Sequence, residues 1–228
     1  MIGIYSRHNW PILSIDTKKK EPVGNFKRNG TEYCAKGSPR AVNDHDFYDE
    51  LAVPYGIYDY NHNVGFVNLG RSKDTPEFAV ESLSRWWDNY GYFMYPDAKK
   101  ILLLADSGGS NGYDRRMFKK YLADLAKKLG VVFYVCHYPP GCSKYNRIER
   151  RYFSMISIST QAQPVDSLEE FAELIKYTTT ETGLKSICVI DYNIYNTGQK
   201  IGKREYDALP IRRSSVVSKL NYWIGDEL

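Results

Sequence analysis

Apolar and polar residues follow one another along the chain in blocks that predict short strands and amphipathic helices. Continuous apolar runs over 101–105 and 131–136 are typical of strands that are buried on both faces of a sheet. Between these runs, apolar residues from Arg115 to Leu129 recur at helical spacing, and Gly130 is placed to end that helix. The pattern predicts a strand–helix–strand unit at the centre of the chain.

The N-terminal part predicts strands that precede this unit. Residues 10–15 alternate, and the strand-like runs 55–60 and 64–69 are separated by Asn-His-Asn, which favours a hairpin. A helix is predicted over 75–90, because threonine and proline at its first two positions supply an N-cap and a favourable first turn. Three strands therefore come before the first long helix.

Towards the C-terminus, two helices are predicted over 146–157 and 165–177, followed by an apolar strand over 186–192. A strand meander followed by alternating strands and helices fits an α/β fold with a mixed sheet flanked by helices, and this order is characteristic of the ribonuclease H-like fold. We expect that domain to cover residues 1–205. Residues 195–228 are polar and glycine-spaced and are harder to assign to helices or strands, and 206–228 are expected to form a C-terminal extension.

The composition is that of an ordinary globular protein. The chain has 228 residues, of which 43% are hydrophobic and 25% charged, and its net charge of +4 favours no partner strongly. It has no apolar run long enough for a membrane span and no signal-peptide core, so we expect no membrane partner. Its cysteines show no C-x-x-C spacing, which indicates reduced thiols in the cytoplasm; a zinc site that includes them is a weaker alternative.

Candidate chemistry lies where predicted strands end. Asp16 and Asp106 each follow an apolar strand, and Glu149 falls one turn into the helix after another strand. Open α/β sheets carry their chemistry at the carboxyl ends of strands, so these carboxylates are expected to converge. Carboxylate oxygens hold Mg²⁺ or Mn²⁺, and two such ions about 4 Å apart promote phosphodiester hydrolysis. Asp59, beside the predicted hairpin turn, is a rival for the first carboxylate, and three unrelated surface acids are the simpler alternative.

Basic residues flank the three acids in the sequence. We expect several of them to border the same cleft and to contact DNA phosphates, which positions DNA without reading its sequence. The run at 18–20 is equally compatible with a solvated turn and with steering of a polyanion into the site. The predicted DNA-binding residues are Lys18, Lys19, Lys20, Lys144, Arg147, Arg150 and Arg151.

Six segments between residues 10 and 205 carry a family pattern. They are Ile-Asp-Thr-Lys-Lys-Lys-Glu at 15–21, Pro-Tyr-Gly-Ile-Tyr-Asp at 54–59, Ala-Val-Glu-Ser-Leu-Ser-Arg-Trp-Trp at 79–87, Ala-Asp-Ser-Gly-Gly-Ser-Asn-Gly at 105–112, Val-Cys-His-Tyr-Pro-Pro-Gly-Cys-Ser-Lys-Tyr-Asn-Arg-Ile-Glu at 135–149 and Thr-Thr-Thr-Glu-Thr-Gly-Leu-Lys at 178–185. In this order the segments resemble the DDE transposases of bacterial insertion sequences. The Asn-x-Ile-Glu ending is similar to that of the wider mariner-like group.

This resemblance implies a ribonuclease H-like catalytic domain in which Asp16, Asp106 and Glu149 bind two Mg²⁺ or Mn²⁺ ions. It implies metal-dependent DNA cleavage at transposon ends and strand transfer into target DNA, by a homo-oligomer assembled on the DNA. Family members also carry an N-terminal helix-turn-helix region, and we expect this sequence to lack one because Met1 lies close to the first catalytic strand.

The pattern departs from the family at Cys142 and Tyr145, where threonine and tryptophan are expected. Two alternatives stay open beside the transposase interpretation. One is a non-catalytic DNA-binding remnant that keeps the fold, and the other is a ribonuclease H-like nuclease that serves repair.

Overall fold

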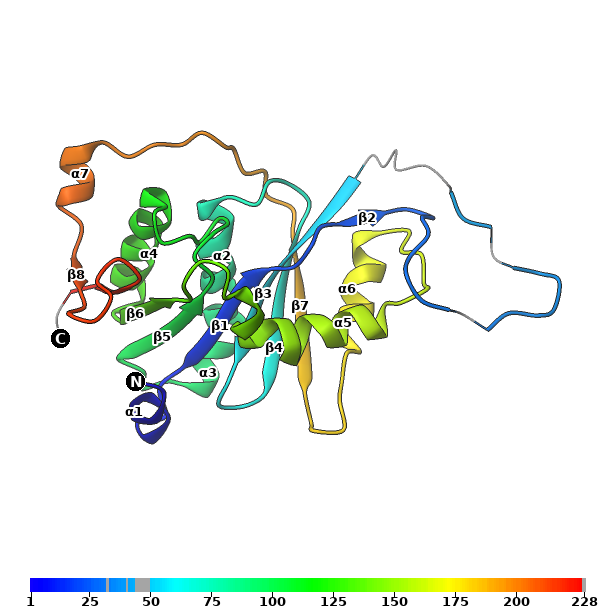
Figure 1. The fold of residues 1–228 in the computed structure, drawn as a ribbon, viewed down its shortest axis with the longest axis horizontal. Helices are drawn as coiled ribbons and strands as arrows, with labels where there is room; N and C mark the ends of the chain where they lie inside the picture. The colour runs from blue at the N-terminus through cyan, green and yellow to red at the C-terminus, as the bar shows by residue number, and fades with distance from the viewer. Residues whose placement is uncertain (32, 40, 44–49, 227–228) are drawn as a thin grey trace.

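The computed structural model describes residues 1–31, 33–39, 41–43 and 50–226. The strands among them are β1 (Ile12–Thr17), β2 (Glu21–Val23), β3 (Glu50–Asp59), β4 (Val64–Gly70), β5 (Lys100–Ala105), β6 (Val132–His137), β7 (Lys185–Asp191), β8 (Ile211–Arg213) and β9 (Asn221–Ile224). They form one sheet in the order β7-β4-β3-β1-β5-β6-β9-β8, and β2 pairs with β3 beside this path (Figure 1).

The sheet is mixed. β5 runs parallel to both β1 and β6, and β7 runs parallel to β4. β3 is antiparallel to its neighbours β1 and β4, so the hairpin predicted from the Asn-His-Asn turn is present. The apolar run that predicted β5 is buried from Ile101 to Ala105, as expected for a central strand covered on both faces.

The helices occupy the segments between these strands. They are α1 (Ile2–Arg7), α2 (Pro76–Trp86), the π-helix η1 (Trp87–Gly91), α3 (Tyr92–Met94), α4 (Arg116–Leu129), the 3₁₀ turn η2 (Ser143–Tyr145), the π-helix η3 (Glu149–Phe153), α5 (Ser154–Ser159), α6 (Leu168–Lys176) and α7 (Lys203–Asp207). The predicted cap of α2 forms, since the Thr75 hydroxyl accepts a bond of 3.2 Å from the backbone nitrogen of Phe78. Gly130 ends α4 in the left-handed conformation.

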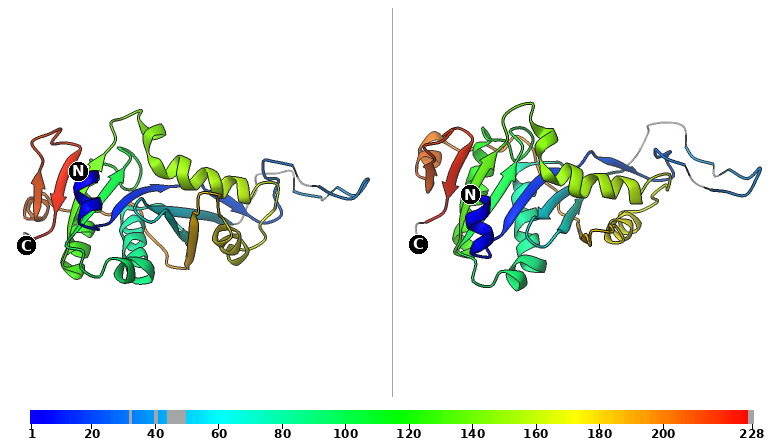
Figure 2. Two further views of the ribbon diagram at one scale, coloured as in Figure 1. Left: turned by 90° about the horizontal axis from the view of Figure 1, so that it is seen from below. Right: turned by 60° about the horizontal axis from the view of Figure 1, so that its bottom comes forward.

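Two large apolar cores pack helices against the sheet, and a smaller cluster packs α1 against β1, β5 and β6. The larger core joins α2 and α4 to one face through side chains such as Phe78, Trp86 and Phe118. A second core joins η3, α5 and α6 to the strands through Tyr152, Phe153 and their neighbours. Figure 2 shows α5 along one face of the sheet and α2 along the other. The second core therefore holds η3, and with it Glu149, against the strands.

The helix predicted over 146–157 differs from the expectation between Glu149 and Phe153, where it is π-helical. The consecutive aromatic residues Tyr152 and Phe153 are both buried there, and glycines in the strands make room for their rings. A Cβ on Gly56 would meet the ring of Phe153 and would lie 2.9 Å from Cδ1 of Ile148. The absence of a side chain at Gly56 therefore lets this helix approach β3 closely.

The C-terminal residues contribute to the same sheet. Within the predicted extension, β9 pairs antiparallel with β6 and β8 pairs antiparallel with β9. The division of the chain at residue 205 stays a prediction about domain organisation. No helix in the described part of the chain is long and apolar enough to cross a bilayer.

Candidate active site

The register of two parallel strands brings the first two predicted acids to one edge of the sheet. Ile15 of β1 is the partner of Ala105 of β5, so Asp16 and Asp106 follow at the same level of adjacent strands. Asp16 is also the cross-strand partner of Gly56 in β3, the residue over which the helix with Glu149 passes. Side chains of paired residues share one face of a sheet, so Asp16 faces that helix.

Asn146 connects this edge to the helix that carries Glu149. Its side-chain oxygen accepts a hydrogen bond from the Ser14 hydroxyl, and its Nδ2 donates to Oδ1 of Asp106 over 3.0 Å. The same Ser14 oxygen accepts a bond of 3.1 Å from the backbone nitrogen of Ile148. This role of Asn146 was not predicted from the sequence, where its only signal was a place in the Asn-x-Ile-Glu motif. These bonds fix the start of the helix on β1, next to Asp106.

The three carboxylates act on one another electrostatically. Burial raises the pKa of Asp16 to about 7, and the negative charges of Asp106, Glu149 and Asp74 add to that effect. Burial also raises the pKa of Asp106. The pKa of Glu149 is raised by burial and by Asp106, and Lys18 opposes this. Burial of the carboxylates and repulsion between them both cost free energy. A cation placed among these groups would offset both costs, because it favours the charged form of each carboxyl group.

The carboxylate oxygens at this site are the kind of ligand that a hard divalent ion prefers. Among the described residues, the Asp16 carboxylate accepts one hydrogen bond, of 2.8 Å from the backbone nitrogen of Thr17, and Asp106 accepts one, from Asn146. Most of their lone pairs are therefore free for Mg²⁺ or Mn²⁺. No three His, Cys, Asp or Glu side chains in the described ranges form a ready-made site for one ion.

Asp59, the rival for the first carboxylate, lies elsewhere. It is the cross-strand partner of Leu13, three residue pairs from Asp16, or about 10 Å along the strand. Because side chains alternate between faces, it also points to the opposite face. Asp59 is fully buried and accepts hydrogen bonds from the hydroxyl of Tyr95. It is separate from the site around Asp16.

Two cavities meet at Glu149, and basic residues line both. One, of about 530 Å³, is lined by Lys18, Lys19, Lys20, Lys27, Arg28 and Glu149 together with polar and apolar neighbours. The other, of about 690 Å³, is lined by Ser143, Lys144, Glu149, Arg150 and Ser154. The structure thus brings together Glu149 and several of the predicted DNA-binding residues, and it adds Lys27 and Arg28, which lie in a polar segment without a recognisable motif.

The lysines of the first cavity are not equivalent. Lys18 is buried, and its ammonium lies 2.5 Å from Oε1 of Glu21, whereas Lys19 and Lys20 are exposed. Arg28 also serves the fold, since its guanidinium lies 4.7 Å from the centre of the Phe171 ring. The solvent-facing charges of this cavity therefore come from Lys19, Lys20 and the exposed Lys27.

Arg147 and Arg151 have other surroundings. The guanidinium of Arg147 lies 4.3 Å from the centre of the Tyr60 ring. Burial raises the pKa of Tyr58, and the positive charges of Arg151 and Arg147 oppose that rise, so both arginines lie near the end of β3. Neither is among the residues that line the two cavities at Glu149.

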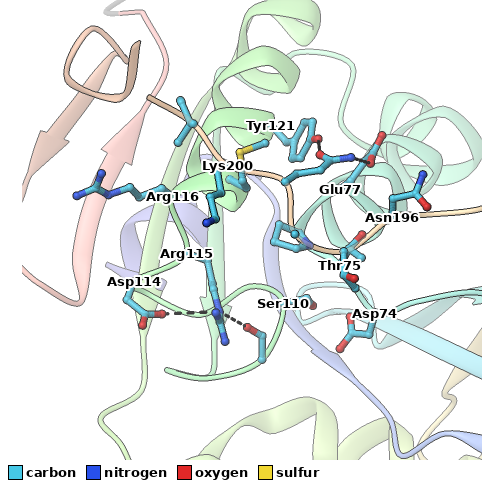
Figure 3. A pocket seen from close by; sticks show the side chains of 17 residues that line it. Asp74, Thr75, Glu77, Ser110, Asp114, Arg115, Arg116, Tyr121, Asn196 and Lys200 are labelled. Carbon is cyan, nitrogen blue, oxygen red and sulfur yellow. Dashed lines mark hydrogen bonds and ion pairs between the residues drawn. The ribbon is translucent and has the colours of Figure 1, made fainter. Parts of the chain in front are cut away.

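A further cavity of about 710 Å³ opens beside Asp74, whose charge acts on Asp16 (Figure 3). Its lining includes the basic residues Arg115, Arg116 and Lys200 and the acidic residues Asp74, Glu77 and Asp114. Arg115 donates a bond of 3.1 Å to the carbonyl of Gly109, and its Nε lies 3.9 Å from the Asp114 carboxylate. This cavity has no excess of positive charge, in contrast to the cavities at Glu149.

Comparison with known proteins identifies the family of this chain. A model of the Rhodopirellula transposase DDE domain matches residues 2–225. The match defines the class as DDE transposase domains, as the six sequence segments suggested. The chain belongs to the family of the Rhodopirellula transposase DDE domain.

Solved structures similar to this chain include the Mos1 transposase paired-end complex with left transposon end, at a TM-score of 0.50 and 15% identity, covering 75% of this chain and 49% of that chain. The Mos1 mariner paired end complex with Mn is similar at a TM-score of 0.46 and 14% identity, with the same coverage. The chain thus spans about half the length of the Mos1 chain. No curated protein sequence matches this chain. The predicted ribonuclease H-like fold is confirmed.

Proposed function

We propose that this chain is the catalytic domain of a DDE transposase, which cleaves DNA at transposon ends and joins them to target DNA in the cytoplasm. The observation that carries the proposal is the placement of Asp16 and Asp106 at one level of adjacent strands, with Glu149 fixed beside them through Asn146. Family membership supports the same activity.

Asp16, Asp106 and Glu149 would hold two Mg²⁺ or Mn²⁺ ions, which when bound supply an activated nucleophile and stabilise charge on the leaving oxygen of a phosphodiester. The protein's own part is to fix these carboxylates. Asn146 keeps the carboxylate of Asp106 at the edge it shares with Asp16. Lys18 lowers the pKa of Glu149 against the effect of burial, so it favours the charged form of that carboxylate.

The two basic cavities at Glu149 suit the sugar–phosphate backbone of DNA. Exposed cations there, including Lys19, Lys20, Lys144 and Arg150, would contact phosphates and position a strand over the carboxylates. The Mos1 relative is described as a paired-end complex with a transposon end, which supports DNA as the partner of this chain. Assembly of a homo-oligomer on that DNA is part of the proposal.

The first prediction tests the carboxylates directly with the substitution Asp106→Asn, which keeps the size of the side chain and removes its charge. We expect the native chain to nick or join DNA that carries the correct transposon ends in Mn²⁺ or Mg²⁺, and the variant to lose at least about 100-fold in rate, on the order of other losses of transition-state charge stabilisation. Mn²⁺ should also raise the melting temperature of the native protein by mass action, and less so that of the variant. The matched control is Asp114→Asn, which alters an exposed acid outside the triad.

The results separate the alternatives. Mn²⁺ stabilisation that depends on Asp106, without any nicking or joining, would identify a non-catalytic remnant. Cleavage that is indifferent to transposon ends would identify a nuclease of the same fold. Equal Mn²⁺ stabilisation of the native protein and the Asp106→Asn variant would show that Asp106 is not a ligand, and the proposed function would fail.

A further inference from the structure

A continuous chain of hydrogen bonds joins the C-terminal hairpin to the backbone of Asp106. His137 is the last residue of β6 and the strand partner of Ala105. Its Nδ1 lies 2.8 Å from the carbonyl oxygen of Asp106, and its Nε2 lies 2.8 Å from the hydroxyl of Tyr222 in β9. His137 is 5% exposed and Tyr222 is fully buried, so neither bond competes with bulk water.

The direction of these bonds follows from their chemistry. A carbonyl oxygen only accepts, so Nδ1 of His137 carries the proton and donates to Asp106. In the neutral ring Nε2 is then an acceptor, and the hydroxyl of Tyr222 donates to it. Lys119 completes the packing, with its ammonium 4.7 Å from the centre of the Tyr222 ring. The tyrosine therefore selects the tautomer of His137 that holds Asp106.

The hydrogen bond from His137 reaches the backbone just after the end of β5. Asp106 is the first residue after β5, and Gly108 and Gly109 follow it in a loop. The loop is held at Ser107 and Gly109, whose carbonyls accept bonds from the backbone nitrogen of Tyr113 (3.4 Å) and from Arg115 (3.1 Å), and the bond from His137 acts on the carbonyl of Asp106 itself. Asn146 holds the carboxylate end of this residue and His137 holds its carbonyl end.

We propose that His137 and Tyr222 are positioning residues that keep Asp106 in the geometry needed for metal binding, so that β9 is part of the active site's support. This inference rests on the proposed function. The bonds to Asp106 give a metal site a supporting shell of the kind whose loss weakens metal affinity by about 10- to 100-fold in other proteins.

The test measures the dissociation constant for Mn²⁺ by calorimetry on the full chain, at a temperature where each variant is folded. His137→Leu removes both hydrogen bonds and is expected to weaken Mn²⁺ binding by about tenfold or more. His137→Asn keeps a donor near the position of Nδ1 and should restore most of the affinity. Tyr222→Phe removes only the hydroxyl and should give an intermediate loss.

The matched control is Tyr195→Phe, which also removes a buried tyrosine hydroxyl. This hydroxyl bonds over 2.6 Å to Asp191, the last residue of β7, at the opposite end of the strand order from β9 and β8. The substitution should cost stability and leave the Mn²⁺ affinity unchanged. With DNA, His137→Leu should lower kcat and leave KM for DNA near the native value, because the phosphate-binding residues are intact.

Each result bears on a different statement. If His137→Leu and Tyr222→Phe bind Mn²⁺ as the native chain does, while Asp106→Asn does not, the positioning role is wrong and the proposed function stands. If the native chain and Asp106→Asn bind Mn²⁺ equally, the proposed function itself fails. Should His137→Leu not fold, the comparison of Tyr222→Phe with Tyr195→Phe decides, and equal affinities overturn the inference.

Discussion

The β1–β3 pair carries two aspartates whose surroundings are opposite. Asp59 is fully buried and accepts hydrogen bonds from the hydroxyls of Tyr95, at 2.7 and 2.8 Å, and Tyr90, at 3.2 Å. The backbone nitrogen of Asn61 adds a third donor at 3.0 Å, and Nδ1 of His62 lies 3.0 Å from the same carboxylate. The carboxylate of Asp16, by contrast, accepts one hydrogen bond within the described part of the chain and faces other carboxylates.

The number of hydrogen-bond donors around a carboxylate distinguishes a structural acid from a candidate metal ligand. A buried carboxylate whose lone pairs are filled by protein donors is already solvated by the protein and offers few lone pairs to a metal ion. Asp191 follows the Asp59 pattern, since Arg85, Tyr195 and Asn68 all donate to it. Asp16 has the opposite pattern, in which charge is buried against like charge. Such an arrangement costs stability unless an ion binds, which is the condition expected of a metal site.

The largest predicted effect is on the free energy of unfolding of the metal-free protein, and it should distinguish Asp59 from Asp16. Asp59→Ala leaves several buried donors without a partner and should lower the free energy of unfolding by about 3–5 kcal/mol. Asp16→Asn removes one charge from a repelling group and should leave that free energy at pH 7 unchanged or raise it. Urea unfolding measures both, with Asp97→Ala at an exposed site as control. A decrease for Asp16→Asn as large as that for Asp59→Ala would remove the distinction.

The next effect is a pH dependence that only the Asp16 site should show. The pKa of Asp16 is raised to about 7 from an ordinary value of 3.8, so between these values the folded chain holds a proton that the unfolded chain has released. Its contribution to stability is therefore complete below about pH 4 and disappears as pH rises through 7. Because Asp16 is partly exposed, we expect roughly 2–3 kcal/mol rather than the full value of the shift.

His137 acts in the opposite sense and must be separated from Asp16. Burial lowers its pKa to about 4 from 6.5, so stability falls as pH drops through that window. Subtracting the unfolding free energies of Asp16→Asn from those of the native protein, at each pH from about 4 to 8 without metal, isolates the contribution of Asp16. A difference that is flat across this range would show that Asp16 titrates normally and is not buried against its neighbours.

The smallest predicted effect compares exposed lysines with the buried Lys18, which forms an ion pair with Glu21. Lys19→Gln, Lys20→Gln or Lys27→Gln should each weaken DNA binding of any sequence and reduce the salt slope of log K by about 0.9 for every phosphate that is no longer neutralised. Lys18→Gln should instead lower stability, because it breaks the ion pair with Glu21. Filter binding at several salt concentrations measures the slope. The native slope in all three exposed variants would show that Lys19 and Lys20 belong to a solvated turn and that Lys27 makes no phosphate contact.

Much of the fold follows from local pattern. The apolar run before Asp106, the helix ended by Gly130 and the hairpin between β3 and β4 are all visible in the sequence, because strand and helix periodicity and turn residues are local properties. Residues 195–228 could not be placed in this way. Their strands are short, and the stability of β9 comes from pairing with β6 far away in the chain.

The sequence alone determined which acids stand at strand ends, since a carboxylate that follows an apolar run is recognisable without coordinates. Tertiary structure decided which of them share a site. The register of β1 with β5 sets Asp16 beside Asp106, and the antiparallel register with β3 sends Asp59 to the other face. Hydrogen bonds between residues distant in sequence, such as Asn146 with Ser14 and His137 with Tyr222, decided which side chains at the site are fixed in place. Such pairings depend on the packing of whole elements, so no local pattern encodes them.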